Sequence, residues 1–124
     1  MVQILFKKKS IIHGTGVFAS RDIKQGIIFY KIPMKNIFNA PQSNCAHIGK
    51  NLWVSDEEVL NYVNHSCDAN ARLDILDKPL LLAKRDIHKN EEITVDYNET
   101  EKDGKNVPCT CKTKNCKKYF LRIE

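Results

Sequence analysis

Short apolar runs separated by polar turns extend along this chain. The runs are rich in β-branched and aromatic residues, a composition typical of strands. We therefore expect strands at residues 2–9, 17–19, 26–32, 52–54, 80–83 and 93–97. Residues 36–49 are expected to form a loop, and the charged residues 99–108 a mobile linker. Six to eight short strands with little helix predict a mostly β fold.

Two further local signals add to this prediction of strands: a helix start and a repeated triplet. Ser55 can cap a helix, and Glu58, three residues later, is placed as its capping-box partner. The helix should last about two turns, because residues 64–66 no longer carry its pattern. The triplet Arg-Asp-Ile, at residues 21–23 and 85–87, precedes a turn and a strand each time, which suggests two similar strand–turn–strand units.

The size and charge of the chain limit what it can be. Its 124 residues suffice for one compact domain, and 42% hydrophobic residues suffice for a core. The net charge is +5, but the basic residues are dispersed, so direct nucleic-acid binding is not expected as the main function. The apolar run at residues 4–6 is too short for a secretory signal, and no run reaches membrane-spanning length. We therefore expect a soluble intracellular protein.

Five cysteines introduce the first candidate chemistry. Their odd number, without a secretory signal, argues against a disulfide framework. Three of them form a Cys-x-Cys-x4-Cys pattern at Cys109, Cys111 and Cys116, and zinc prefers four tetrahedral sulfur or nitrogen ligands. The spacing predicts a structural zinc ion that orders the tail. The fourth ligand is left open among Cys67, Cys45, His65 and His47.

Three segments upstream of this tail complete a recognisable order. They are Gly-Thr-Gly-Val-Phe-Ala at residues 14–19, Tyr-Val-Asn-His-Ser-Cys-Asp-Ala-Asn at 62–70 and Glu-Glu-Ile-Thr-Val-Asp-Tyr-Asn at 91–98. Together with the cysteine tail, they resemble the SET-domain protein lysine methyltransferases that carry a post-SET zinc tail. The resemblance covers nearly the whole chain. It implies a SET domain at residues 1–100 and a post-SET tail at 101–124, forming one compact unit.

The resemblance implies a fold that the strand pattern alone does not predict. Members of the family are built from small curled β-sheets with little helix. Their Asn-His-Ser-Cys segment is threaded beside the C-terminal segment in a pseudoknot-like arrangement. Such threading is unusual among protein folds.

The resemblance also implies a reaction. Members transfer a methyl group from S-adenosylmethionine to a lysine amine by an in-line displacement, which depends mainly on alignment. The amine must be neutral, and lowering its pKa from ~10.4 to ~7–8 requires about 3–4 kcal/mol of differential interaction. A dry, apolar channel and a neighbouring sulfonium charge both act in that direction.

The matching motifs assign residues to this chemistry. By resemblance, Tyr97 is catalytic and orients the amine and the methyl group, while Tyr30 lines the lysine channel. The implied cofactor-binding residues are His13, Gly14, Thr15, Gly16, Asn64, His65 and Tyr97, with Tyr119, Phe120 or Leu121 on the adenine. The implied zinc ligands are Cys67, Cys109, Cys111 and Cys116. Such a zinc site would tie the tail to the cofactor-binding segment.

Other residues depart from the motifs or lie outside them. Val95 stands where many members carry an aromatic residue that limits the number of methyl groups, so product multiplicity stays open. Trp53 is expected in the core, and Tyr62 mainly in packing. Cys45 is expected to be a small buried side chain, and His47 a surface imidazole.

The expected substrates are lysines in flexible protein tails, of histones or of other proteins, that dock by adding a strand beside the channel. A chain of positive net charge repels a basic tail unless its groove is locally acidic. The residues that could supply this acidity are Asp56, Glu57, Glu58, Asp74, Asp77, Glu99, Glu101 and Asp103. Two other functions fit parts of the sequence: a catalytically inactive SET module that binds a protein tail, and a small zinc-stapled nucleic-acid-binding domain.

Overall fold

The structure is a computed structural model that describes residues 4–12, 14–40, 45–48, 52–75, 79–97, 105–109, 113–114 and 116–122. Strands dominate it. They are β1 (Leu5–Lys9), β2 (Thr15–Ala19), β3 (Ile28–Lys31), β4 (Asn36–Phe38), β5 (Ala46–His47), β6 (Trp53–Ser55), β7 (Asn64–His65), β8 (Ala71–Ile75), β9 (Pro79–Ala83), β10 (Glu92–Val95), β11 (Lys105–Pro108) and β12 (Tyr119–Arg122). One short 3-10 helix, η1 (Leu60–Tyr62), interrupts them. Among these residues, no helix has the length and apolar character needed to span a membrane.

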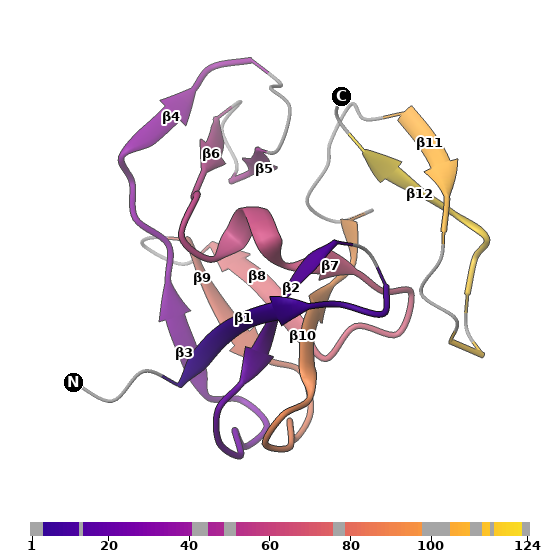
Figure 1. Ribbon diagram of the computed structural model, residues 1–124. Helices are drawn as coiled ribbons and strands as arrows, with labels where there is room; N and C mark the ends of the chain where they lie inside the picture. The colour runs from indigo at the N-terminus through magenta and orange to yellow at the C-terminus, as the bar shows by residue number, and fades with distance from the viewer. Residues whose placement is uncertain are drawn as a thin grey trace.

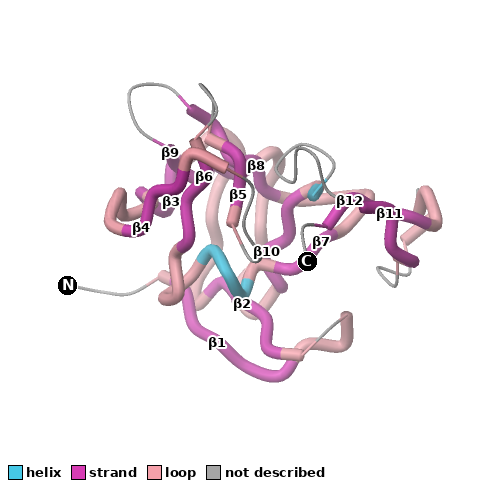
Figure 2. Tube along the Cα trace, turned by 90° about the horizontal axis from the view of Figure 1, so that it is seen from above, coloured by secondary structure: helices cyan, strands magenta, loops and turns pink. Residues whose placement is uncertain are grey.

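The strands form four small sheets (Figure 1). One has the order β1-β2-β10-β7, a second β3-β9-β8 and a third β4-β6-β5, and β11 and β12 form an antiparallel hairpin. Seen from above, the β11–β12 hairpin lies at one side of the molecule and β3, β4 and β6 at the other (Figure 2). The mostly β fold of small sheets that the sequence predicts is confirmed.

The core lies where the first two sheets face each other. Their central strands β2, β9 and β10 are buried along most of their length, and Val17, Leu81 and Ile93 are at most 1% exposed. Val63, just after η1, joins the same cluster at 1% exposure. Burying one such side chain contributes about 1.5–3 kcal/mol. The core therefore fixes β10 and the end of η1, between which β7 lies.

The two Arg-Asp-Ile triplets lie against each other, and their pairing confirms the two units that the repeat suggests. Ile23 and Ile87 form an antiparallel bridge with reciprocal backbone hydrogen bonds of 2.8 and 2.7 Å. The aspartates act reciprocally as well. Asp22 accepts a backbone N–H from the second unit and Asp86 accepts one from the first, each at 2.8 Å. The turns between β2 and β3 and between β9 and β10 lie side by side at the bottom of Figure 1.

Equivalent turn residues in these two units share an unusual backbone conformation. Gly26 has φ of 85° and Asn90 has φ of 72°, in the left-handed region that glycine and asparagine tolerate best. The N–H of Gly26 donates to Ala83 O at 2.8 Å, and that of Asn90 donates to Ala19 O at 2.7 Å. The turn of the first unit is thus bonded to the end of β9, and the turn of the second unit to the end of β2.

The pairing of β7 with β10 brings distant parts of the chain together. The two strands are parallel, with Asn64 opposite Thr94 and His65 opposite Val95. The ladder continues as Ser66 N donates to Val95 O at 3.1 Å. The Asn-His-Ser-Cys segment therefore lies beside β10, the strand of the Glu-Glu-Ile-Thr-Val-Asp-Tyr motif near the C-terminal end of the SET domain, as the resemblance implies.

Asn70 joins the same segment to β10. It is 2% exposed, and its side-chain amide donates to Glu91 Oε2 at 2.8 Å and to Glu92 O at 2.7 Å. Its side-chain oxygen accepts the N–H of Thr94 at 2.9 Å. Because Asn70 is buried and pairs with these groups of Glu91, Glu92 and Thr94, it fixes the position of the Asn-His-Ser-Cys segment relative to β10.

Replacing Asn70 by alanine is expected to lower the free energy of unfolding by about 2–4 kcal/mol, because it leaves buried backbone groups of β10 without partners. Urea denaturation followed by circular dichroism measures the change. The control is Asn36→Ala at an exposed position of β4, with an expected change within about 0.5 kcal/mol. Similar losses in the two variants would show that Asn70 does not anchor the segment.

The predicted loop and linker are wrong in part. Residues 36–49 contain β4 and β5, which pair with opposite edges of β6. Residues 99–108 include β11, which pairs with β12. These strands are only two to four residues long, so alternation along the chain gives little signal of them. They form because β6 and β12 lie beside them and exchange backbone hydrogen bonds with them.

The predicted helix start at Ser55 is also wrong. Ser55 ends β6, and the only helix described nearby is the single 3-10 turn η1. Asp56, the next residue, holds the turn before η1 instead: its carboxylate accepts the N–H of Glu58 at 3.2 Å and that of Leu60 at 3.0 Å. At 4% exposure, this aspartate is buried beneath the turn.

Candidate functional site

Tyr97, two residues after the end of β10, is held by the segment that contains Val63 and His65. Its hydroxyl donates to Val63 O at 2.6 Å, and its backbone N–H donates to His65 Nδ1 at 2.9 Å. The rings of Tyr97 and His65 are tilted at 59° with centroids 5.4 Å apart. The parallel pairing of β7 and β10 thus brings these two predicted site residues together.

The hydrogen bonds of His65 define its protonation state. Its Nδ1 accepts from Tyr97, so in the neutral ring Nε2 carries the proton. Burial lowers the pKa of His65, and Lys117 adds to this shift while the charge of Asp96 opposes it. His65 is therefore neutral. The 3.7 Å approach of Nδ1 to Asp96 Oδ1 is then a contact with a polar ring and not an ion pair.

Asn64 is oriented by a carboxylate at the start of β10. Its side-chain amide donates to Glu92 Oε2 at 2.9 Å, and Ser10 Oγ donates to Glu92 Oε1 at 2.7 Å. A Cβ added to Gly16 would collide with the same carboxylate and approach Ser10 Cβ to 3.0 Å. A side chain at position 16 would therefore displace the Glu92 carboxylate from its position against Ser10 and Asn64. Glu92 joins the Gly-Thr-Gly turn to the Asn-His segment.

The other residues predicted to bind the cofactor are either exposed or outside the described residues. Gly14 is exposed, with φ of 46° and open space around the position of a Cβ, and Thr15 is exposed at the start of β2. His13 lies outside the described residues. Tyr119 is 57% exposed on β12, and the side chain of Phe120 lies outside the described part of that strand. The predicted packing of these two rings on an adenine stays a prediction.

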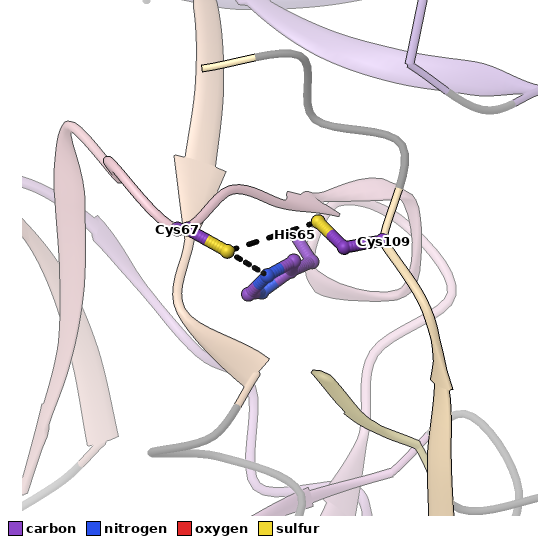
Figure 3. Close-up of side chains that lie close together, drawn as sticks. All are labelled: His65, Cys67 and Cys109. Atoms are coloured by element: carbon purple, nitrogen blue, oxygen red, sulfur yellow. Dashed lines mark hydrogen bonds between the residues drawn. The ribbon is translucent and has the colours of Figure 1, made fainter. Parts of the chain in front are cut away.

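Potential metal ligands gather at the junction of β7 with the tail (Figure 3). One ligand atom each of His65, Cys67 and Cys109 lies within 4.8 Å of the others. The sulfur atoms of Cys67 and Cys109 are 3.8 Å apart, too far for a disulfide. Two thiolates on one tetrahedral zinc, each at ~2.3 Å, lie about 3.8 Å apart. The sulfur pair therefore has the separation of zinc ligands.

His65 fits the role of a hydrogen-bond donor better than that of a ligand. Its Nε2, which carries the proton, lies 3.4 Å from Cys67 Sγ. The backbone N–H of Lys117 donates to the same sulfur at 3.2 Å. Two N–H donors around one sulfur suit a metal-bound thiolate, whose charge they stabilise.

The remaining two predicted ligands are in the loop that joins β11 to β12. The ladder extends beyond the hairpin, since Cys109 N donates to Lys118 O at 2.7 Å. Cys116 Sγ accepts the N–H of Lys118, which has φ of 70°, at 3.3 Å. Cys116 is not in the group formed by His65, Cys67 and Cys109, and Cys111 lies outside the described residues.

Tyr30 lies in a different environment from Tyr97. Its hydroxyl donates to Asp56 Oδ2 at 2.6 Å. Burial, then the hydrogen bond to Asp56, raises the pKa of Tyr30 above its ordinary value, so it remains a protonated donor. The ring lines a cleft of about 760 Å³ whose lining does not include Tyr97 or His65.

Three residues outside the motifs meet in the β4-β6-β5 region. Trp53 and Cys45 are each 3% exposed, as expected. The expected surface position of His47 is wrong: its Nε2 is buried, and its ring centroid lies 5.1 Å from that of Trp53. Pairing of β5 with β6 places His47 opposite Trp53 and accounts for the burial.

Sequence reasoning missed the polar residues that position the site. Ser10 and Asn70 had no assigned role, and the Glu-Glu pair at residues 91–92 was used only as a motif. Asp56 was noted only for its charge. The signal available was the presence of Asn70 and the Glu-Glu pair inside the two quoted motifs. Their role depends on pairing between β7 and β10, which neither motif reveals by itself.

Comparison with known proteins relates this geometry to a family. Residues 14–98 match the SET domain family model. The chain is 26% identical over 138 residues to Histone-lysine N-methyltransferase trr of Drosophila melanogaster, covering 94% of this chain and 6% of that protein. It is 30% identical over 132 residues to Histone-lysine N-methyltransferase set1 of Dictyostelium discoideum, covering 89% and 9%. The chain thus spans less than a tenth of the length of these relatives.

A solved structure shares the fold. The methyltransferase domain of human Histone-lysine N-methyltransferase SETMAR superposes with a TM-score of 0.65 at 20% identity, covering 94% of this chain and 56% of that one. The family match spans more than half of the chain and includes Asn64, His65 and Tyr97. This protein belongs to the SET domain family.

Proposed function

We propose that this chain transfers methyl groups from S-adenosylmethionine to lysine amines of proteins. The observation that carries the proposal is the meeting of Tyr97, His65 and Asn64 where β7 pairs with β10. The relatives named as histone-lysine methyltransferases support the same reaction class.

The residues around β7 suit a polar cofactor. When bound, S-adenosylmethionine would supply a methyl group on a positively charged sulfur. Asn64 and His65 would hold it from the outer strand of the sheet, and Gly14, Thr15 and Gly16 from the opposite wall, where the exposed Gly14 has no side chain to cover its backbone. Glu92 keeps the Asn64 amide in one orientation, so little ordering is needed on binding.

Tyr97 suits the amine of the substrate. Its hydroxyl proton is committed to Val63 O, so toward a reacting amine the oxygen acts as an acceptor. An acceptor at this position orients an N–H of the neutral amine and so directs the nitrogen lone pair.

We assign the zinc site to Cys67, Cys109, Cys111 and Cys116. The 3.8 Å separation of the first two sulfurs and the N–H donors to Cys67 and Cys116 support this assignment. The role is structural, because four thiolates leave no open coordination position. Zinc there would fasten the β11–β12 hairpin to the segment that carries Asn64 and His65.

The proposed substrate is a histone or another chromatin protein, in agreement with the names of the relatives. The test is transfer of label from radioactive S-adenosylmethionine to a panel of histones and to a total protein extract, with zinc present. Labelling of discrete bands is expected. A folded, zinc-loaded protein that binds the cofactor but labels nothing would favour the inactive module, and one that does not bind the cofactor would exclude the proposed reaction.

A further inference from the structure

A second concave surface lies between β1, β3 and the turn before η1. The cleft has a volume of about 760 Å³. Its apolar lining includes Ile4 and Leu5 from the N-terminal strand, Phe29 from β3, and Val59. Three of these are only partly buried, so the cleft offers apolar surface that no described part of the chain covers completely.

Two carboxylates line the same cleft. Glu57 and Glu58 are exposed, and within the described residues neither has an ion-pair partner. Asp56 precedes them and adds a buried negative charge, which the Tyr30 hydroxyl at 2.6 Å and the backbone donors of the turn hold in place. The turn is therefore locally acidic within a chain of net charge +5.

Among the described residues of the lining there is one lysine, Lys7, and it does not neutralise these carboxylates. Lys7 Nζ lies 4.5 Å from the ring centroid of Tyr62, in a cation–π contact. That contact satisfies the ammonium on an aromatic face. The cleft thus combines apolar walls with unpaired negative charge, a combination complementary to a peptide that alternates apolar and basic side chains.

We propose that this cleft docks a short segment of the protein substrate in which a lysine or arginine lies beside an apolar residue. The proposal rests on the proposed methyltransferase function, since it assigns a second contact for the same substrate. The described lining of the cleft includes Tyr30, which the resemblance places in the lysine channel, but neither Tyr97 nor His65. The docked segment would therefore lie beside the channel, away from the reacting centre. The negative charge of this turn would offset the repulsion between a basic enzyme and a basic substrate tail.

The first test measures docking without catalysis. The probe is a fluorescein-labelled peptide of sequence Gly-Leu-Arg-Gly-Leu-Arg-Gly, which has no lysine side chain to accept a methyl group. Fluorescence anisotropy without S-adenosylmethionine should show salt-sensitive binding to the wild-type protein. The double variant Glu57→Gln, Glu58→Gln should bind the probe about threefold to tenfold more weakly, as expected for two exposed charge pairs.

The matched control is Asp74→Asn, which removes an acidic charge on β8 that pairs with Arg72 at 2.9 Å and lies outside the cleft. This variant should bind the probe like the wild type. Equal binding by the control and the double variant, or no binding by the wild type, would overturn the proposal. Self-association that the double variant abolishes would also overturn it and would indicate that a second copy of this chain occupies the cleft.

The second test separates docking from the proposed reaction. With a histone substrate, the double variant should raise KM about threefold to tenfold and leave kcat unchanged, because the lost contact holds substrate and transition state equally. Methyl transfer with an unchanged KM would refute docking and keep the reaction. Probe binding that the double variant loses, without any methyl transfer by the wild type, would support the docking site and refute the reaction.

Discussion

Replacing Tyr97 by phenylalanine is expected to lower kcat for methyl transfer by a factor of about 100 to 1,000, the usual cost of removing one polar group from the reacting centre. The hydroxyl is fixed at 2.6 Å from Val63 O, so its oxygen presents an acceptor in one direction. Phenylalanine keeps the ring against His65 but removes that acceptor. Labelled methyl transfer under saturating cofactor measures the loss.

The control for this variant is Tyr62→Phe. Tyr62 is 37% exposed at the end of η1, and phenylalanine there keeps the face on which Lys7 lies. Its activity should stay within about twofold of the wild type, because surface changes away from a site have small effects. Cofactor binding should be nearly equal in the wild type and both variants. An active Tyr97→Phe variant would show that the hydroxyl only braces the strand end.

Replacing Cys67 by serine is expected to remove the zinc ion and to detach the tail from the rest of the domain. Loss of an outer hydrogen-bond partner already weakens metal binding about 10- to 100-fold, and loss of a ligand should cost more. Because Cys67 follows β7 directly, the change should also lower the affinity for S-adenosylmethionine. Zinc content after competition with a chelator, and limited proteolysis between residues 98 and 124, measure the two effects.

Cys45→Ala is the matched control, since Cys45 is a buried cysteine packed near Trp53 outside the metal group. It should retain one zinc ion for each chain. Full zinc occupancy in Cys67→Ser would exclude Cys67 as a ligand and would return His65 to the set of candidates. Equal zinc loss in both variants would indicate general unfolding, which circular dichroism would detect.

The longer strands could be predicted because their signal is local. The apolar runs at residues 17–19 and 80–83 became β2 and β9, where the core selects the same residues that the pattern selects. Strands β5 and β7 have two residues each, and no periodicity can be detected in so short a segment. They exist because β6 and β10 are beside them. The error at Ser55 has a similar cause, since Asp56 and Tyr30 meet only in the folded chain.

For the candidate site, too, the local motifs could be predicted from the sequence and the contacts between them could not. The motif gave Asn64, His65 and Tyr97, and the structure brings them together at β7 and β10. Neither motif could show that Glu92 orients Asn64 and lies against Gly16, because those contacts join residues that are far apart in the sequence. The spacing of the cysteines also left the fourth ligand open. Hydrogen bonding now favours Cys67, since His65 uses its ring nitrogens for Tyr97 and for the sulfur.

The parallel pairing of β7 with β10 has a consequence for the synthesis of this protein. Asn64 leaves the ribosome 30 residues before Thr94, its partner, so the strand that carries it cannot be completed when it first emerges. At ~5–20 residues per second, the wait is about 1.5–6 seconds. Contacts so distant in sequence also form slowly in the released chain. The segment that carries Asn64 and His65 should therefore be among the last to gain protection from hydrogen exchange. A nascent chain stalled after this segment has emerged from the ribosome, but before Thr94 has, should expose it to chaperones.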